Sequence, residues 1–138
     1  MQATETEISA KTVLVVDDDP VVLKLVSGIV TGGGFRLLTA ISGKAALKLS
    51  NDYKDRIDLL VTDFQMPEVT GIDLATQITA DRPDIKVLLM SGFPAGMLVL
   101  NEGWHFLPKP FVPSQLLTLI SGLITPNKQS KFTANVGQ

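Results

Sequence analysis

Short runs of apolar and β-branched residues alternate along this chain with longer segments in which apolar residues recur every three or four positions. The short runs are typical of strands buried on both faces of a parallel sheet, and the longer segments of helices that cover such a sheet. The pattern predicts a doubly wound α/β domain with five parallel strands and five helices in alternation. The expected strands are 12–16, 35–39, 57–62, 85–90 and 104–107, and the expected helices are 20–31, 43–50, 72–81, 95–101 and 114–124.

Two junctions in this pattern have recognisable end signals. Asp19 is placed to cap a helix whose first residue is Pro20, and the glycines at 32–34 end that helix. The strand at 57–62 runs directly into Asp63 and a short turn. In that turn Pro67 restricts the backbone, and we expect Gly71 to supply the conformational freedom that the backbone needs to enter the next helix.

The composition indicates one globular domain. The chain has 138 residues, of which 45% are hydrophobic, and its formal net charge of -2 predicts no general affinity for nucleic acid or for a membrane surface. No cysteine is present, and the single histidine, His105, is expected to be an exposed strand residue. We expect a flexible arm at 1–10, one domain at 11–125 and a disordered tail at 126–138. Residues 1–9 lack the features of a secretion signal, which favours a cytoplasmic protein.

Polar side chains follow four of the five expected strands. Asp17 and Asp18 follow the first strand, Asp63 the third, Ser91 the fourth and Lys109 the fifth. The carboxyl ends of parallel strands meet at one edge of the sheet, where open α/β folds bind their ligands. Three carboxylates in a small site repel one another unless a cation is bound, and oxygen ligands suit Mg²⁺, with Mn²⁺ as a substitute. The set predicts a centre that accepts a phosphoryl group on Asp63, with Lys109 and the cation stabilising charge.

Four segments in this order resemble the receiver domains of bacterial two-component response regulators. They are the first strand with Asp17-Asp18, the segment Asp63-x-x-Met66-Pro67-x-x-x-Gly71, the segment Met90-Ser91-Gly92, and the segment Lys109-Pro110-Phe111. The resemblance covers residues 12–124. It implies a flavodoxin-like sheet of strand order 2-1-3-4-5, and Mg²⁺-dependent phosphorylation of Asp63 by a histidine kinase or a His-containing phosphotransfer protein.

The resemblance also implies individual roles. Asp18 would be a direct metal ligand and Asp17 an outer one that acts mainly through water, while Gln65 would offer its backbone carbonyl to the metal. The side chains of Gln65 and Phe93 would tune the lifetime of the phosphate. Ser91 would move toward the phosphoryl group, and the aromatic ring of Phe106 would turn inward in response; Phe106 as a plain core residue is the alternative.

The segment between Ser91 and Lys109 departs from the family pattern because it is short and interrupted by Gly96. The fourth helix, at 95–101, is therefore expected to be truncated or irregular. In this family that helix forms the output face together with the fifth strand and fifth helix, so the partner surface is expected to be unusual. One exposed side of the apolar residues 97–100 is a candidate contact for a partner protein.

Two other functions compete with the phosphorylation switch. Asp17-x-Asp19-x-Val21 after an apolar strand is also similar to the nucleophile motif of haloacid-dehalogenase-type phosphatases, although the later acidic pair of that family is missing. The second competitor is a receiver-like adaptor that works without phosphate. We interpret the chain as a stand-alone switch that binds a downstream protein; the cognate kinase, the target and the oligomeric state, including a homodimer, are left open.

Overall fold

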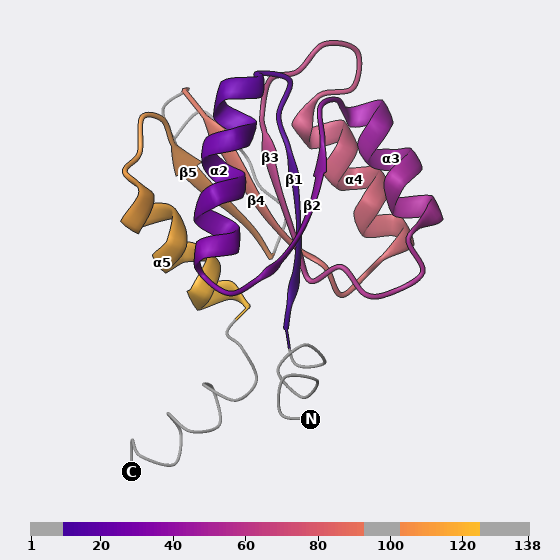
Figure 1. Ribbon diagram of the computed structural model, residues 1–138. Helices are drawn as coiled ribbons and strands as arrows, with labels where there is room; N and C mark the ends of the chain where they lie inside the picture. Colours follow the sequence, from indigo (N-terminus) through magenta and orange to yellow (C-terminus); the bar gives the residue numbers. More distant parts are fainter. Residues whose placement is uncertain (1–9, 93–102, 125–138) are drawn as a thin grey trace.

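The computed structural model describes residues 10–92 and 103–124. Five parallel strands form one sheet of order β2-β1-β3-β4-β5 (Figure 1). The strands are β1 (Thr12–Val16), β2 (Arg36–Ala40), β3 (Leu59–Asp63), β4 (Lys86–Ser91) and β5 (Trp104–Pro108). Four helices lie in the described part of the chain: α2 (Pro20–Gly32), α3 (Gly43–Asp52), α4 (Gly71–Asp81) and α5 (Pro113–Leu123).

The predicted strand order and the alternation of strands and helices are confirmed, with shifts of one or two residues at several element ends. The fourth helix, expected at 95–101, and Phe93 lie outside the described residues. Residues 1–9 of the expected N-terminal arm and all of the expected tail at 126–138 also lie outside the described residues. No helix in the described ranges is long and apolar enough to cross a membrane.

The sheet separates two hydrophobic cores because successive strand side chains point to opposite faces. On β1, Val13 and Val15 belong to the core under α2 and α5, and Leu14 and Val16 belong to the core under α3 and α4. Figure 1 shows the two helix pairs on opposite sides of the sheet. All five residues of β1 and of β3 are buried, as expected for central strands with both faces covered.

Helix α2 begins as the sequence predicts. The side chain of Asp19 accepts a hydrogen bond from the backbone N–H of Val21, and Pro20 occupies the first helical position, where a missing N–H costs nothing. The helix buries Val26 and Val30 against the sheet. Helical spacing alone predicts that Leu25 shares the apolar face of Val26 and Val30. Leu25 is instead 50% exposed, because the buried face of this helix is narrower than its apolar face.

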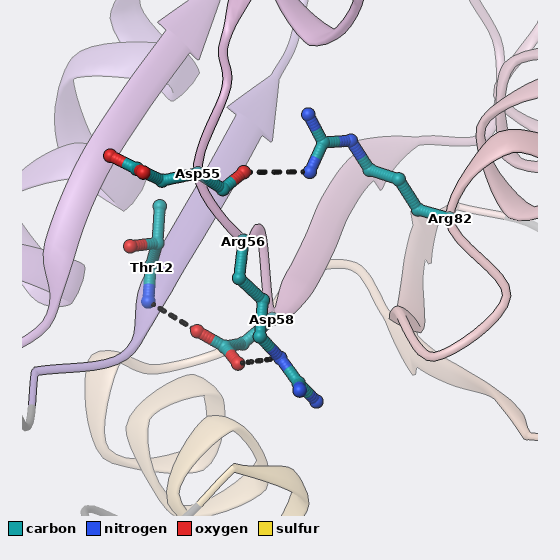
Figure 2. Close-up of polar contacts among 5 residues, drawn as sticks. All are labelled: Thr12, Asp55, Arg56, Asp58 and Arg82. Atoms are coloured by element: carbon teal, nitrogen blue, oxygen red, sulfur yellow. Dashed lines mark hydrogen bonds and ion pairs between the residues drawn. The ribbon is translucent and has the colours of Figure 1, made fainter.

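The amino edge of the sheet is held by two side chains (Figure 2). The carboxylate of Asp58 accepts a hydrogen bond of 2.8 Å from the backbone N–H of Thr12. It also forms an ion pair with the guanidinium of Arg56 at 2.8 Å. The guanidinium of Arg82 donates to the backbone carbonyls of Ser50, Tyr53 and Asp55, and to the hydroxyl of Ser50. Helix α4 is thereby fastened to the segment that leads from α3 into β3. The opposite edge of the sheet is left for the site.

Candidate phosphoryl-acceptor site

Three carboxylates come together at the carboxyl edge of β1 and β3. One carboxylate oxygen from each of Asp17, Asp18 and Asp63 lies within 4.8 Å of the others. Asp17 and Asp63 are buried, and Asp18 is exposed. The strand topology produces this cluster, because β1 and β3 are neighbours in register, with Val16 opposite Thr62. The predicted meeting of these residues is therefore confirmed.

Asp17 is the most confined member of the cluster, with 1% of its surface exposed. Its Oδ1 accepts a hydrogen bond of 2.9 Å from the backbone N–H of Asp19. Its Oδ2 is buried and has no hydrogen-bond partner within the described chain. Burial raises the pKa of Asp17 from 3.8 to about 6. The nearby charge of Asp63 adds to the increase, while the Asp19 hydrogen bond and the charge of Lys109 oppose it.

The geometry of these groups fits a hard divalent cation. A buried carboxylate oxygen without a partner is costly, and a cation that coordinates it would remove that cost. Oxygen donors from three carboxylates, with one of the three residues open to solvent, suit Mg²⁺, which keeps several waters in its coordination shell. Asp17, Asp18 and Asp63 would hold the ion.

Lys109 supplies the positive charge of the site. Its Nζ lies 2.6 Å from Oδ1 of Asp63; the Asp63 side chain is largely buried and the Lys109 side chain partly buried. Its backbone N–H donates to the carbonyl of Ser91 at 2.7 Å, which fixes the lysine to the end of β4. The peptide bond between Lys109 and Pro110 is cis. The flexible side chain of Lys109 extends from a backbone that the hydrogen bond to Ser91 holds at the end of β4.

The remaining predicted site residues differ in how deeply they are buried. Ser91 is buried at the last position of β4, one residue beyond Met90, which pairs with Asp63 in the sheet. Phe106 is half-buried and packs against the core under α3 and α4. The side chain of Gln65 is exposed. His105 is half-buried in β5, where it pairs with Leu88 of β4, so the expectation of an exposed histidine is wrong.

The turn after Asp63 is built differently from the sequence expectation. The residue with a positive φ is Glu68, at 66°, and Gly71 is not among the positive-φ residues. Gly71 is required for another reason: a Cβ there would lie 2.2 Å from the carbonyl oxygen of Asp63. Its N–H donates to the carbonyl of Phe64 at 2.9 Å. The first residue of α4 thus packs directly against the backbone of Asp63.

Two contacts at the site carry no signal in the linear sequence. The hydroxyl of the buried Thr62 donates to the carbonyl of Asp63 at 3.0 Å. The third aspartate of the triplet, Asp19, both caps α2 and donates its N–H to Asp17. The sequence reveals Asp19 as a cap, but only the fold shows that it also orients a site carboxylate.

Known proteins of one family are similar to this chain over most of its length. A family model described as response regulator receiver domain matches residues 13–121. The two-component response regulator ORR5 of Oryza sativa subsp. japonica is 34% identical over 118 residues, covering 81% of this chain and 87% of ORR5. A protein of Arabidopsis thaliana with the name two-component response regulator ARR13 is 32% identical over 131 residues, covering 91% of this chain and 23% of ARR13.

A solved structure is also similar over most of the chain. The response regulator receiver domain protein from Clostridium thermocellum aligns with a TM-score of 0.75 and 26% identity, covering 86% of this chain and 98% of that structure. The present chain therefore spans nearly the whole of that structure and most of ORR5, but about a quarter of the length of ARR13.

Proposed function

Because this chain belongs to the receiver domains of two-component response regulators, we propose that it is a signalling switch controlled by phosphorylation of Asp63. The observation that carries the proposal is the Asp63 carboxylate, held 2.6 Å from Lys109 at the carboxyl edge beside Asp17 and Asp18. A carboxylate in this setting is a competent nucleophile whose reaction is promoted mainly by positioning and by fixed charges.

The proposed donor is a phosphohistidine on a histidine kinase or a phosphotransfer protein. An oxygen of Asp63 attacks the phosphorus, the P–N bond to the imidazole breaks, and the imidazole leaves with its electron pair and takes up a proton. Lys109 stabilises the charge on the transferring oxygens through its ammonium group. Mg²⁺ held by Asp17, Asp18, Asp63 and the backbone carbonyl of Gln65 would neutralise phosphoryl charge when bound.

The proposed readout is a change of the protein-binding face. Ser91 lies at the end of β4, and its carbonyl accepts the N–H of Lys109, so a phosphoryl group on Asp63 that attracts the serine hydroxyl also moves this junction. Phe106 on β5 follows, and the face formed by β5 and α5 changes its affinity for a downstream protein. Gln65 and Phe93 set how long the phosphate persists. The switch acts by binding and turns over no substrate beyond its own phosphate.

Intact-mass measurement after incubation with acetyl phosphate tests the proposal. We expect one phosphoryl adduct on the wild type, dependent on Mg²⁺ or Mn²⁺ and absent from Asp63→Asn. No adduct on a wild type that binds Mg²⁺ would favour the phosphate-independent adaptor. An adduct that persists in Asp63→Asn would move the chemistry to another carboxylate, with Asp17 and the phosphatase alternative as the next hypothesis.

A further inference from the structure

The start of helix α3 lies directly against the segment that follows the phosphoacceptor. A Cβ placed on Gly43 would lie 2.6 Å from Cβ of Val69, 2.7 Å from its Cγ1 and 3.0 Å from its carbonyl oxygen. Non-bonded carbon atoms do not approach this closely, so any side chain at position 43 has to displace Val69. Figure 1 shows α3 beginning at the same edge of the sheet as the loop that precedes α4.

The segment 64–70 has little freedom to absorb such a displacement locally. The N–H of Gly71 donates to the carbonyl of Phe64 at 2.9 Å, and the N–H of Val69 donates to the carbonyl of Pro67 at 2.7 Å. Met66 is buried in the core under α3 and α4, and Glu68 holds a positive φ. A displacement of Val69 therefore also displaces the backbone of this short, hydrogen-bonded turn toward Gln65 and Asp63.

We propose that Gly43 is a positioning residue for the cation site: its missing side chain sets the position of segment 64–70 and, through it, the affinity for Mg²⁺. The inference rests on the proposed function only in taking the Gln65 carbonyl as a metal ligand. Gly43 touches neither the metal nor the phosphoryl group, and its effect passes through Val69.

The chain supplies a matched control. A Cβ on Gly28, in the interior of α2, meets no atom within 4 Å, so Gly28→Ala makes the same chemical change without a clash. Val69→Gly removes both carbon atoms that the new methyl group would meet. The double variant Gly43→Ala with Val69→Gly then tests whether the effect of the alanine depends on Val69.

Mg²⁺ alone is titrated into the full chain by calorimetry, and the NMR chemical shifts of the backbone amides are compared among the metal-free proteins. We expect Gly43→Ala to weaken Mg²⁺ binding about tenfold, the size typical for residues that support a metal ligand, and to shift the amide signals of 64–71. Gly28→Ala should match the wild type in both. In the Val69→Gly background, the alanine should change the affinity by less than about twofold.

Several outcomes would overturn the proposal. The first is a Gly43→Ala protein that binds Mg²⁺ as tightly as the wild type. The second is a loss of Mg²⁺ affinity on Gly43→Ala that is equally large in the Val69→Gly background. The third is a wild type that binds no Mg²⁺. If Gly43→Ala does not fold, a folded double variant with the affinity of Val69→Gly supports the proposal, and an unfolded double variant contradicts it. The phosphoryl adduct is measured separately, so a wild type that binds Mg²⁺ without forming the adduct refutes the proposed function alone.

Discussion

The ammonium group of Lys109 lies 2.6 Å from Oδ1 of Asp63, although 46 residues separate the two in the chain. The contact spans β3, β4 and β5, and it is made possible because the backbone of Lys109 is hydrogen bonded to the carbonyl of Ser91 at the end of β4. The lysine is thus delivered to the acidic cluster by the sheet itself.

Replacing Lys109 by methionine should slow formation of the Asp63 adduct by about 100-fold, because a fixed positive charge next to the transferring oxygens is lost. Mg²⁺ binding should be retained, since the three carboxylates stay in place. The adduct rate is followed by intact mass and the metal affinity by calorimetry. Lys48→Met, which removes an exposed lysine paired with Asp52, is the control. A Lys109→Met protein as fast as that control would remove Lys109 from the mechanism.

Asp17 should make the metal-free protein less stable as the pH rises. Its pKa is about 6 in the fold against the usual 3.8, so between these values the folded state holds a proton that the unfolded state has released. Folding stability therefore falls from about pH 4 to about pH 6, by roughly 3 kcal/mol for a shift of this size.

Asp17→Asn should remove this dependence. In the presence of EDTA the variant should gain up to about 3 kcal/mol over the wild type at pH 7.5 and almost nothing at pH 4, measured by urea unfolding at the two pH values. Added Mg²⁺ should reduce the difference at pH 7.5 by stabilising the wild type. An equal gain at both pH values would mean that the asparagine acts through packing and not through the charge.

Asp58→Ala should destabilise the protein by about 2–4 kcal/mol, because it leaves the buried N–H of Thr12 without its acceptor. Arg56→Ala removes only the exposed partner of the same carboxylate and should cost less than about 1 kcal/mol. Urea unfolding measures both. Asp58 and Arg56 lie at the amino edge of the sheet, opposite Asp63, so the folded variants should form the Asp63 adduct at the wild-type rate. Equal losses of stability in the two variants would show that the ion pair, and not the Thr12 hydrogen bond, dominates.

Arg82→Ala should cost about 2–4 kcal/mol, since it removes four hydrogen bonds from one guanidinium and leaves carbonyl groups at the end of α3 with fewer donors. Arg82→Lys should recover little of this, because an ammonium group lacks the planar, forked geometry with which the guanidinium reaches three carbonyls. Hydrogen exchange of residues 50–58 localises the effect. A lysine variant as stable as the wild type would show that charge alone suffices at this position.

The sheet and the acidic cluster could be predicted because their signals are local. Apolar runs give the strands, the Asp19-Pro20 pair gives the start of α2, and the aspartates that follow β1 and β3 lie in neighbouring strands once the strand order is known. The errors arise where burial depends on tertiary packing. The burial of His105 and the exposure of Leu25 depend on how widely each element is covered by its neighbours, which periodicity does not report.

The contacts that refine the site could not be predicted, because they join residues through the fold. The approach of Gly43 to Val69 and of Gly71 to the Asp63 carbonyl depends on the packing of helix starts against one turn. A glycine in the sequence indicates either backbone freedom or a close approach, without indicating which applies. At Gly71 the sequence suggests backbone freedom, whereas the fold requires close approach. The Arg82 contacts depend in the same way on where the end of α4 meets the segment after α3.

The aspartate triplet shows how little tolerance the start of the domain has for changes of length. Deleting any one of Asp17, Asp18 and Asp19 gives the same shortened chain, with two aspartates between β1 and Pro20, yet the three residues act as a buried carboxylate, an exposed carboxylate and a helix cap. Two residues cannot occupy three positions. The helix would also begin one residue closer to β1, and each residue of an α-helix turns it by about 100°, so Val26 and Val30 would rotate away from the sheet. Single substitutions in the triplet are expected to be graded in effect, whereas a deletion of one codon should abolish the site and the packing of α2 together.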